Sequence, residues 1–145
     1  MSDKLTTTVL EVLADFCFLF GDPADEGLAL PDKLYRVDVE FSGNKNGRVT
    51  IICDPSLAEF IYQNLMDDES TEFGKEDAIR EFGNVLTGNI LARVYGEDKL
   101  FNLKPPLLSC QRLNDSSEAE EGFYRFVVDG VFLGVKLYEN EDIAG

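Results

Sequence analysis

The spacing of apolar residues in the first half of the chain predicts a helix followed by a β-hairpin. Residues 7–20 are apolar on most sides, and Gly21-Asp22-Pro23 follows as a helix stop, which predicts a largely buried helix. Residues 35–41 then alternate between apolar and polar positions, as a half-buried strand does. The turn "SGNKNG" and the returning strand "RVTIICD" complete the predicted hairpin.

The second half of the chain predicts two helices, an extended segment and a second hairpin. Asp54-Pro55 provides a cap and a first helical residue, and a third helix is expected from residue 75 to about 94. Pro105-Pro106 restricts the following extended segment to a sheet edge or an irregular strand, and residues 111–121 are expected to form an acidic loop. The order of elements predicts an α+β fold with a mainly antiparallel sheet and helices packed on one face.

The third predicted helix has two contrasting faces. The residues expected to face the core are Ile79, Phe82, Leu86 and Ile90. The residues on the opposite face are Asp77, Glu81, Asn84 and Gly88. Glycine inside a helix costs about 1 kcal/mol relative to alanine, but it allows another backbone or a bulky group to approach closely. From spacing alone, this face is either an ordinary solvated surface or a docking surface.

Composition narrows the possible functions. The chain has 145 residues, 44% of them hydrophobic, which predicts a single domain over residues 1–145. Its formal charge of −15 disfavours nucleic acid and anionic membranes as partners. The absence of histidine excludes Ser-His-Asp and Cys-His catalysis and the usual zinc sites. Without a long apolar run or a secretory signal, the protein is expected in the cytoplasm.

The cysteines and a possible internal repeat complete the pattern. Cys17, Cys53 and Cys110 are widely separated in apolar runs, so we expect reduced core residues rather than disulfides or metal ligands.

The segments "TTTVLEVLADF" and "EDAIREFGNVL" each precede a hairpin that begins with Tyr-Arg, at positions 35 and 124. This similarity indicates either an ancient duplication or chance.

The segment "DAIREFGNVLTGN" resembles the helix signature of the CheC/CheX/FliY family of bacterial chemotaxis phosphatases. The positions that match the signature are Asp77, Glu81, Asn84, Gly88 and Asn89. "NGRVTIICDPSLAEFIYQNLM" resembles the strand and proline-started helix that precede the signature, and "LFNLKPPLLS" resembles the extended segment that follows it. The resemblance covers roughly residues 35 to 138.

The resemblance implies a pseudo-symmetric duplicated fold with one intact site. When the two repeats are aligned, Glu11 matches Glu81, but Ala14 stands in the place of Asn84 and Phe18 in that of Gly88. The first helix therefore resembles a silent copy whose surface is given to packing. A single site on a short chain is similar to the CheX type, which is a homodimer assembled through its sheet.

The activity implied by the resemblance is hydrolysis of the aspartyl phosphate of a CheY-type response regulator. Asn84 would orient the attacking water, and Glu81 would pair with the regulator's lysine. The chain would need no cofactor of its own, because Mg²⁺ belongs to the regulator. Asp77, Gly88 and Asn89 are expected at the partner interface, although Asp77 also suits a first-turn acid favoured by the helix dipole. The alternatives are a non-catalytic regulator-binding or flagellar-switch module, and an unrelated acidic interaction protein.

Overall fold

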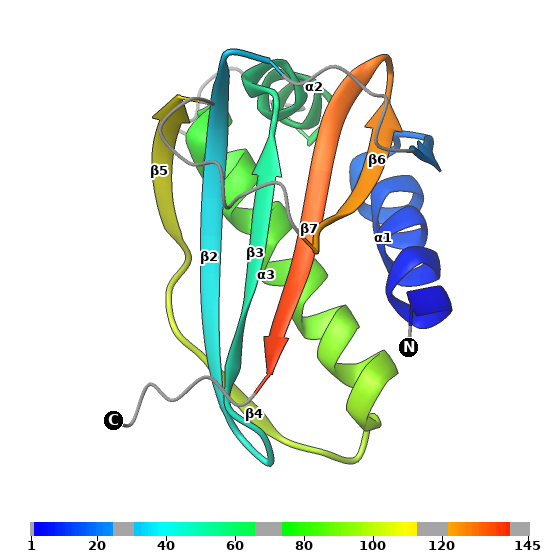
Figure 1. The fold of residues 1–145 in the computed structure, drawn as a ribbon, viewed down its shortest axis with the longest axis vertical. Coiled ribbons are helices and arrows are strands. Elements are labelled where there is room, and N and C mark those ends of the chain that lie inside the picture. The colour runs from blue at the N-terminus through cyan, green and yellow to red at the C-terminus, as the bar shows by residue number, and fades with distance from the viewer. Residues whose placement is uncertain (1, 25–30, 66–73, 113–121, 140–145) are drawn as a thin grey trace.

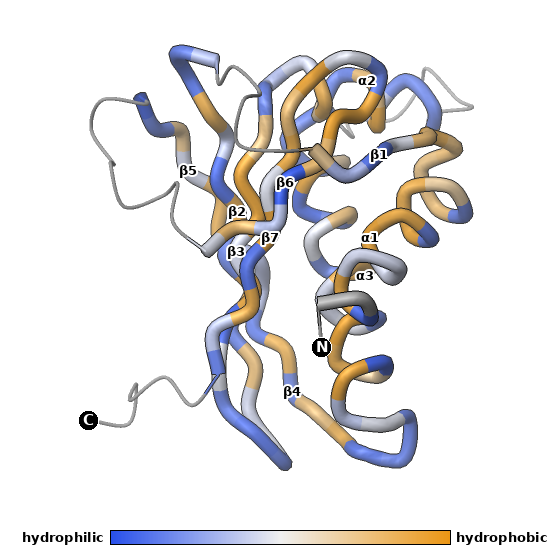
Figure 2. Tube along the Cα trace, turned by 45° about the vertical axis from the view of Figure 1, so that its right-hand side comes forward, coloured by the Kyte–Doolittle hydropathy of each residue, from blue (hydrophilic) through white to orange (hydrophobic). Residues whose placement is uncertain are grey.

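In the computed structural model, which describes residues 2–24, 31–65, 74–112 and 122–139, helices pack against one face of an antiparallel sheet (Figures 1 and 2). The helices are α1 (Ser2–Cys17), α2 (Pro55–Leu65) and α3 (Lys75–Tyr95). The strands are β1 (Gly21–Pro23), β2 (Lys33–Gly43), β3 (Gly47–Cys53), β4 (Phe101–Leu103), β5 (Leu107–Arg112), β6 (Tyr124–Val128) and β7 (Val131–Glu139). This arrangement confirms the predicted α+β fold.

The sheet joins the two predicted hairpins at its centre. Its strand order is β1-β6-β7-β3-β2-β4, and β5 also pairs with β2. The β2–β3 hairpin and the β6–β7 hairpin meet along the β3–β7 pairing, while α1 packs beside α3 (Figure 1). Two helix–hairpin units placed side by side in this way agree with the duplication that the resemblance implies.

On the side away from β3, strand β2 pairs with two short edge strands. Residues 33–38 of β2 pair with β5, and Phe41–Gly43 pair with β4. Pro105 and Pro106 lie between β4 and β5, where no ladder hydrogen bond is required of them. The segment lies at the sheet edge, as the sequence predicted, and the two prolines divide it into two strands.

The core lies between the sheet and α3. Strand β2 turns Tyr35, Val37, Val39 and Phe41 toward the helices, and all four are buried. The predicted apolar face of α3 is also buried, and it consists of Ile79, Phe82, Leu86 and Ile90. Because one helix face is taken up by the core, the orientation of the opposite face is fixed.

The start and end of the first helical segment differ from the prediction. Helix α1 begins at Ser2 rather than near residue 7, and it ends at Cys17 rather than Phe20. Gly21–Pro23, predicted as a helix stop and loop, forms the edge strand β1, in which Gly21 lies opposite Val128 of β6. A three-residue strand has no alternation of its own, so only its pairing with β6 defines it.

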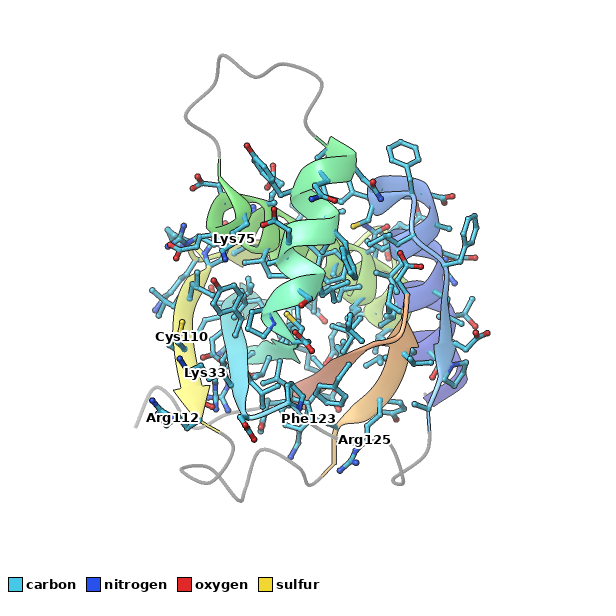
Figure 3. All side chains as sticks on the ribbon, turned by 90° about the horizontal axis from the view of Figure 1, so that it is seen from above. Lys33, Lys75, Cys110, Arg112, Phe123 and Arg125 are labelled. Carbon is cyan, nitrogen blue, oxygen red and sulfur yellow. The ribbon has the colours of Figure 1, made fainter. Side chains whose placement is uncertain are left out.

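The prediction of three core cysteines is right for Cys17 and Cys53 and wrong for Cys110. Burial raises the pKa of the Cys17 thiol to about 12, and burial followed by the nearby Asp54 raises that of Cys53. Cys110 lies on the edge strand β5 and is exposed (Figure 3). Residues 111 and 112, predicted as the start of the acidic loop, belong to β5, and the rest of that loop lies outside the described residues.

Local capping contacts explain where two helices begin. The Asp54 carboxylate accepts the Ser56 backbone N–H at 2.8 Å, as predicted for the start of α2. The Asp77 carboxylate accepts the Gly74 backbone N–H at 3.0 Å at the start of α3. Within the described residues, no helix is both long enough and apolar enough to cross a membrane.

Candidate functional site

The outward face of α3 carries the residues that the sequence singled out. Glu81 and Gly88 are exposed, and Asn84 is half-buried. Glu81 and Asn84 are one helical turn apart, which places them about 4.5 Å from each other along the axis. Gly88 follows Asn84 by about 6 Å along the same axis. The structure therefore brings a carboxylate, a carboxamide and bare backbone together on one exposed ridge.

The side chains of Glu81 and Asn84 are available to a partner. Among the described residues, neither side chain forms a hydrogen bond or an ion pair. The neighbouring Arg80, which could have neutralised Glu81, contacts Asp77 instead, at 3.4 Å between Nη1 and Oδ1. A carboxylate and an amide left free beside each other can accept and donate hydrogen bonds across an interface.

Two glycines in α3, Gly83 and Gly88, differ in the space available around them. A Cβ on Gly83 would lie 2.9 Å from Val37 Cγ1, so the packing of α3 on the sheet requires glycine there. A Cβ on Gly88 would meet nothing within 4 Å. The described part of the chain therefore gives no packing reason for glycine at position 88, which agrees with the prediction of a surface open to close approach.

Asp77 and Asn89 have local contacts in the structure. Asp77 caps the helix through Gly74 and also contacts Arg80. The Asn89 side chain donates from Nδ2 to the Val85 carbonyl oxygen at 2.8 Å. Both side chains are exposed, so each can also meet a partner, but helix capping already accounts for Asp77.

A groove beside Gly88 was not predicted from the sequence. It has a volume of about 260 Å³ and lies between the second half of α3 and the segment leading into β4. Its lining residues are Gly88, Leu91, Ala92, Lys99, Leu100, Phe101 and Leu103. Leu100 is an apolar residue directly after the polar turn "YGEDK" and could have indicated an apolar surface there. The sequence pattern, however, assigned Leu100 to the extended segment that follows.

The side chains on this face offer orientation and electrostatic contact. No group of three histidine, cysteine, aspartate or glutamate side chains that could hold a metal ion occurs in the part of the chain that the structure describes. An amide and an exposed carboxylate are poor nucleophiles, but they can position water and a cationic partner group. The site therefore suits a reaction in which the partner supplies the reactive group.

This fold, with the long helix α3 lying across one face of an antiparallel sheet, is the fold of solved CheX and CheC-like structures. The family described as "Chemotaxis phosphatase CheX" matches residues 36–126, and the chain belongs to that family. The matched segment contains both α2 and α3, and thus all the candidate residues of the site. No curated protein sequence matches the chain significantly.

Solved structures share the fold along almost the whole chain. A putative chemotaxis protein from Desulfovibrio vulgaris Hildenborough is 13% identical with a TM-score of 0.68, and 94% of each chain is covered. CheX from Desulfovibrio desulfuricans is 14% identical with a TM-score of 0.65, covering 95% of this chain and 97% of the other. The CheX-CheY-BeF3-Mg complex from Borrelia burgdorferi is 20% identical with a TM-score of 0.61, covering 97% of each chain.

Proposed function

We propose that this protein hydrolyses the aspartyl phosphate of a CheY-type response regulator. The observation that carries the proposal is the outward Glu81–Asn84 pair, whose side chains form no hydrogen bond or ion pair among the described residues of a chain that belongs to the CheX family. One structure with the same fold is a CheX–CheY complex, which supports a regulator of this type as the partner.

Asn84 orients the attacking water in this proposal. Its carboxamide offers both a donor and an acceptor, so its carbonyl oxygen can accept one water O–H and direct a lone pair at phosphorus. The water oxygen forms a bond to phosphorus while the bond to the aspartate oxygen breaks. The aspartate leaves as a carboxylate, and the water proton passes to the released phosphate. Positioning accounts for most of the catalysis in such reactions, so the absence of histidine is no obstacle.

Glu81 fixes the register of the complex. Its carboxylate would form a charge-assisted hydrogen bond with the lysine of the regulator's phosphorylation site. One helical turn separates that contact from Asn84, so the salt bridge sets the position at which the carboxamide enters the site. We assign Mg²⁺ to the regulator, with no cofactor held by this chain.

Assembly and location form a further part of the proposal. We expect a cytoplasmic homodimer assembled through the sheet, whose other face is not covered by a helix of the described chain (Figure 2). Light scattering coupled to size-exclusion chromatography measures the mass of the particle. Twice the mass of 16.2 kDa supports the homodimer, and a monomer at micromolar concentration contradicts it.

The test of the proposed function is the decay of radiolabelled phosphoryl on a CheY-type regulator. Wild-type protein should accelerate the decay, and Asn84→Ala should lower that acceleration by about 100-fold or more, as the loss of one positioned polar group does in other enzymes. Asn44→Ala is the matched control, because it removes the same group from an exposed turn. Binding of the regulator without any acceleration by wild type would instead support a non-catalytic docking module.

A further inference from the structure

The groove beside Gly88 is continuous with the proposed catalytic ridge. Gly88 belongs both to the outward face of α3 and to the lining of the groove. From there the groove extends past Leu91 and Ala92 toward the connection between α3 and β4. A partner whose phosphorylated residue meets Asn84 would therefore lie over the mouth of the groove.

The floor of the groove is packed against several neighbouring elements. Leu91 is buried, and the Phe101 ring packs edge-on against Phe41 with 5.7 Å between ring centroids. The ring of Tyr95 also lies 5.6 Å from that of Phe101, and the Tyr95 hydroxyl donates a hydrogen bond to Glu139 of β7. Because the aromatic residues are held from several elements, the cavity is preformed and does not require rearrangement on binding.

The rim of the groove is unusual for a solvated surface. Leu100 is 85% exposed, although it also lines the groove. Lys99 is also exposed, and within the described part of the chain its one ion pair is a distant contact with Asp98, at 3.9 Å between Nζ and Oδ2. An apolar rim residue beside a loosely paired cation is suited to a partner that presents an apolar side chain next to a carboxylate.

The groove is placed where it could discriminate between different response regulators. The phosphoaspartate and its lysine are common to the proposed class of partner, so Glu81 and Asn84 cannot discriminate one regulator from another. Discrimination requires contacts with residues that vary around the phosphorylation site. The groove begins about 6 Å beyond Asn84 along the helix axis, within reach of such residues.

We infer that the groove formed by Gly88, Leu91, Lys99, Leu100 and Phe101 is a specificity pocket for the response regulator. It receives an apolar side chain from the regulator's surface beside the phosphorylated aspartate, and Lys99 pairs with a carboxylate next to that side chain. Glycine at position 88 keeps the entrance open. This inference rests on the proposed function, because it takes the phosphorylated regulator as the occupant.

The experiment compares Leu100→Asp and Lys99→Glu with wild type. Steady-state dephosphorylation of a CheY-type regulator should show KM raised about tenfold in each variant, with kcat within twofold of wild type. Binding of the beryllofluoride-loaded regulator, measured by calorimetry, should weaken by a similar factor. Leu107→Ser is the matched control, because Leu107 is 64% exposed but lies outside the groove, and its KM should match wild type.

Separate outcomes test the pocket and the proposed activity. If wild type binds the regulator without accelerating hydrolysis, and Leu100→Asp weakens binding, the pocket stands and the phosphatase proposal fails. If hydrolysis is accelerated and both groove variants keep the wild-type KM and Kd, the pocket is overturned. A change of particle mass in Leu100→Asp without regulator would also overturn it, because the groove would then hold a second copy of this chain. Thermal melting establishes that each variant is folded.

Discussion

Helices α1 and α3 occupy corresponding places in the two repeats, yet their outward faces differ. The carboxylate of Glu11 on α1 pairs with Arg93 of α3 at 2.5 Å, whereas the matching Glu81 on α3 has no such partner among the described residues. Ala14 of α1 occupies the position of Asn84, and Phe18 lies beyond the end of α1 at a φ of 59°. The acid of α1 is therefore paired with the neighbouring helix, and the matching acid of α3 is unpaired within the described residues.

The difference shows that a single intact site does not require an asymmetric fold. The pairing of the helices and hairpins keeps the frame of two repeats, while the two helices differ at the three compared positions, once in ion pairing and twice in residue type. At the third position, Phe18 is 64% exposed instead of leaving bare backbone, so α1 presents no surface open to close approach. The comparison can be tested at each position separately.

The first comparison is between the two matched glutamates, where the expected effect is larger than for the glycines and the buried thiol. Glu81→Ala should reduce kcat/KM for the phosphorylated regulator by about 10- to 100-fold, because a charge-assisted contact to the partner is lost. Its free energy of unfolding should change by no more than about 0.5 kcal/mol, as for other exposed residues without contacts. Activity assays and urea denaturation measure the two quantities.

Glu11→Ala is the matched variant on α1. It removes an exposed ion pair and should cost about 0.2–1 kcal/mol of stability, with activity unchanged. Equal losses of activity in both variants would mean that the two helix faces do not differ in function.

The next effect separates the two glycines of α3. Gly83→Ala should lower the free energy of unfolding by about 1–3 kcal/mol, because the new methyl group would press on Val37 in a packed core. Gly88→Ala should raise it by up to about 1 kcal/mol, because alanine favours the helix and meets no atom. Denaturation midpoints give both values. Destabilisation by Gly88→Ala would indicate a structural reason for that glycine.

These comparisons also show what the sequence could and could not predict. The 3.6-residue pattern of α3 placed Ile79 and Phe82 in the core and Glu81 on the outside, because one buried face dictates the other. The first hairpin followed from the alternation of residues 35–41 and from its turn residues, and the second hairpin followed from its β-rich sequence. Local patterns of this kind depend on neighbours within the same element.

Features that depend on distant segments were not predicted. The strand β1 exists through its pairing with β6, and Cys110 is exposed because β5 lies at the sheet edge. The groove at Gly88 forms only where α3 meets the segment before β4, so no short window of sequence contains it. Availability of Glu81 was likewise undecided until the structure placed Arg80 on Asp77 and Arg93 on Glu11.

A smaller effect concerns the packing role of α1. Burial raises the pKa of Cys17 from 9.0 to about 12, so the folded state holds that proton more tightly than the unfolded chain. The resulting stability is complete below pH 9 and is lost as pH rises from about 9 to about 12. This group should lower the free energy of unfolding by about 1 kcal/mol between pH 9 and pH 10.

Urea denaturation across this pH range measures the slope. Cys17→Ala should be less stable at neutral pH but should lose less stability at alkaline pH. Cys110→Ala, which removes an exposed thiol, should keep the wild-type slope. An unchanged slope in Cys17→Ala would show that the α1 thiol is not held in a buried, protonated state.

The last comparison is expected to show no recovery of phosphatase activity. Ala14→Asn in an Asn84→Ala background restores the carboxamide on α1, but Glu11 remains paired with Arg93 and α1 ends at Cys17. Phosphatase activity should therefore stay at the level of Asn84→Ala alone in the decay assay. Recovered activity would show that the carboxamide position by itself separates an active helix from a silent one.

The most direct test of the central claim is single-turnover hydrolysis at saturating protein, where differences in regulator binding no longer affect the rate. Phosphoryl decay should be faster with wild type than with Asn84→Ala by about 100-fold or more, with the two proteins equally stable. Equal decay rates for wild type and Asn84→Ala would contradict the account, because the outward face of α3 would then bind the regulator without orienting water.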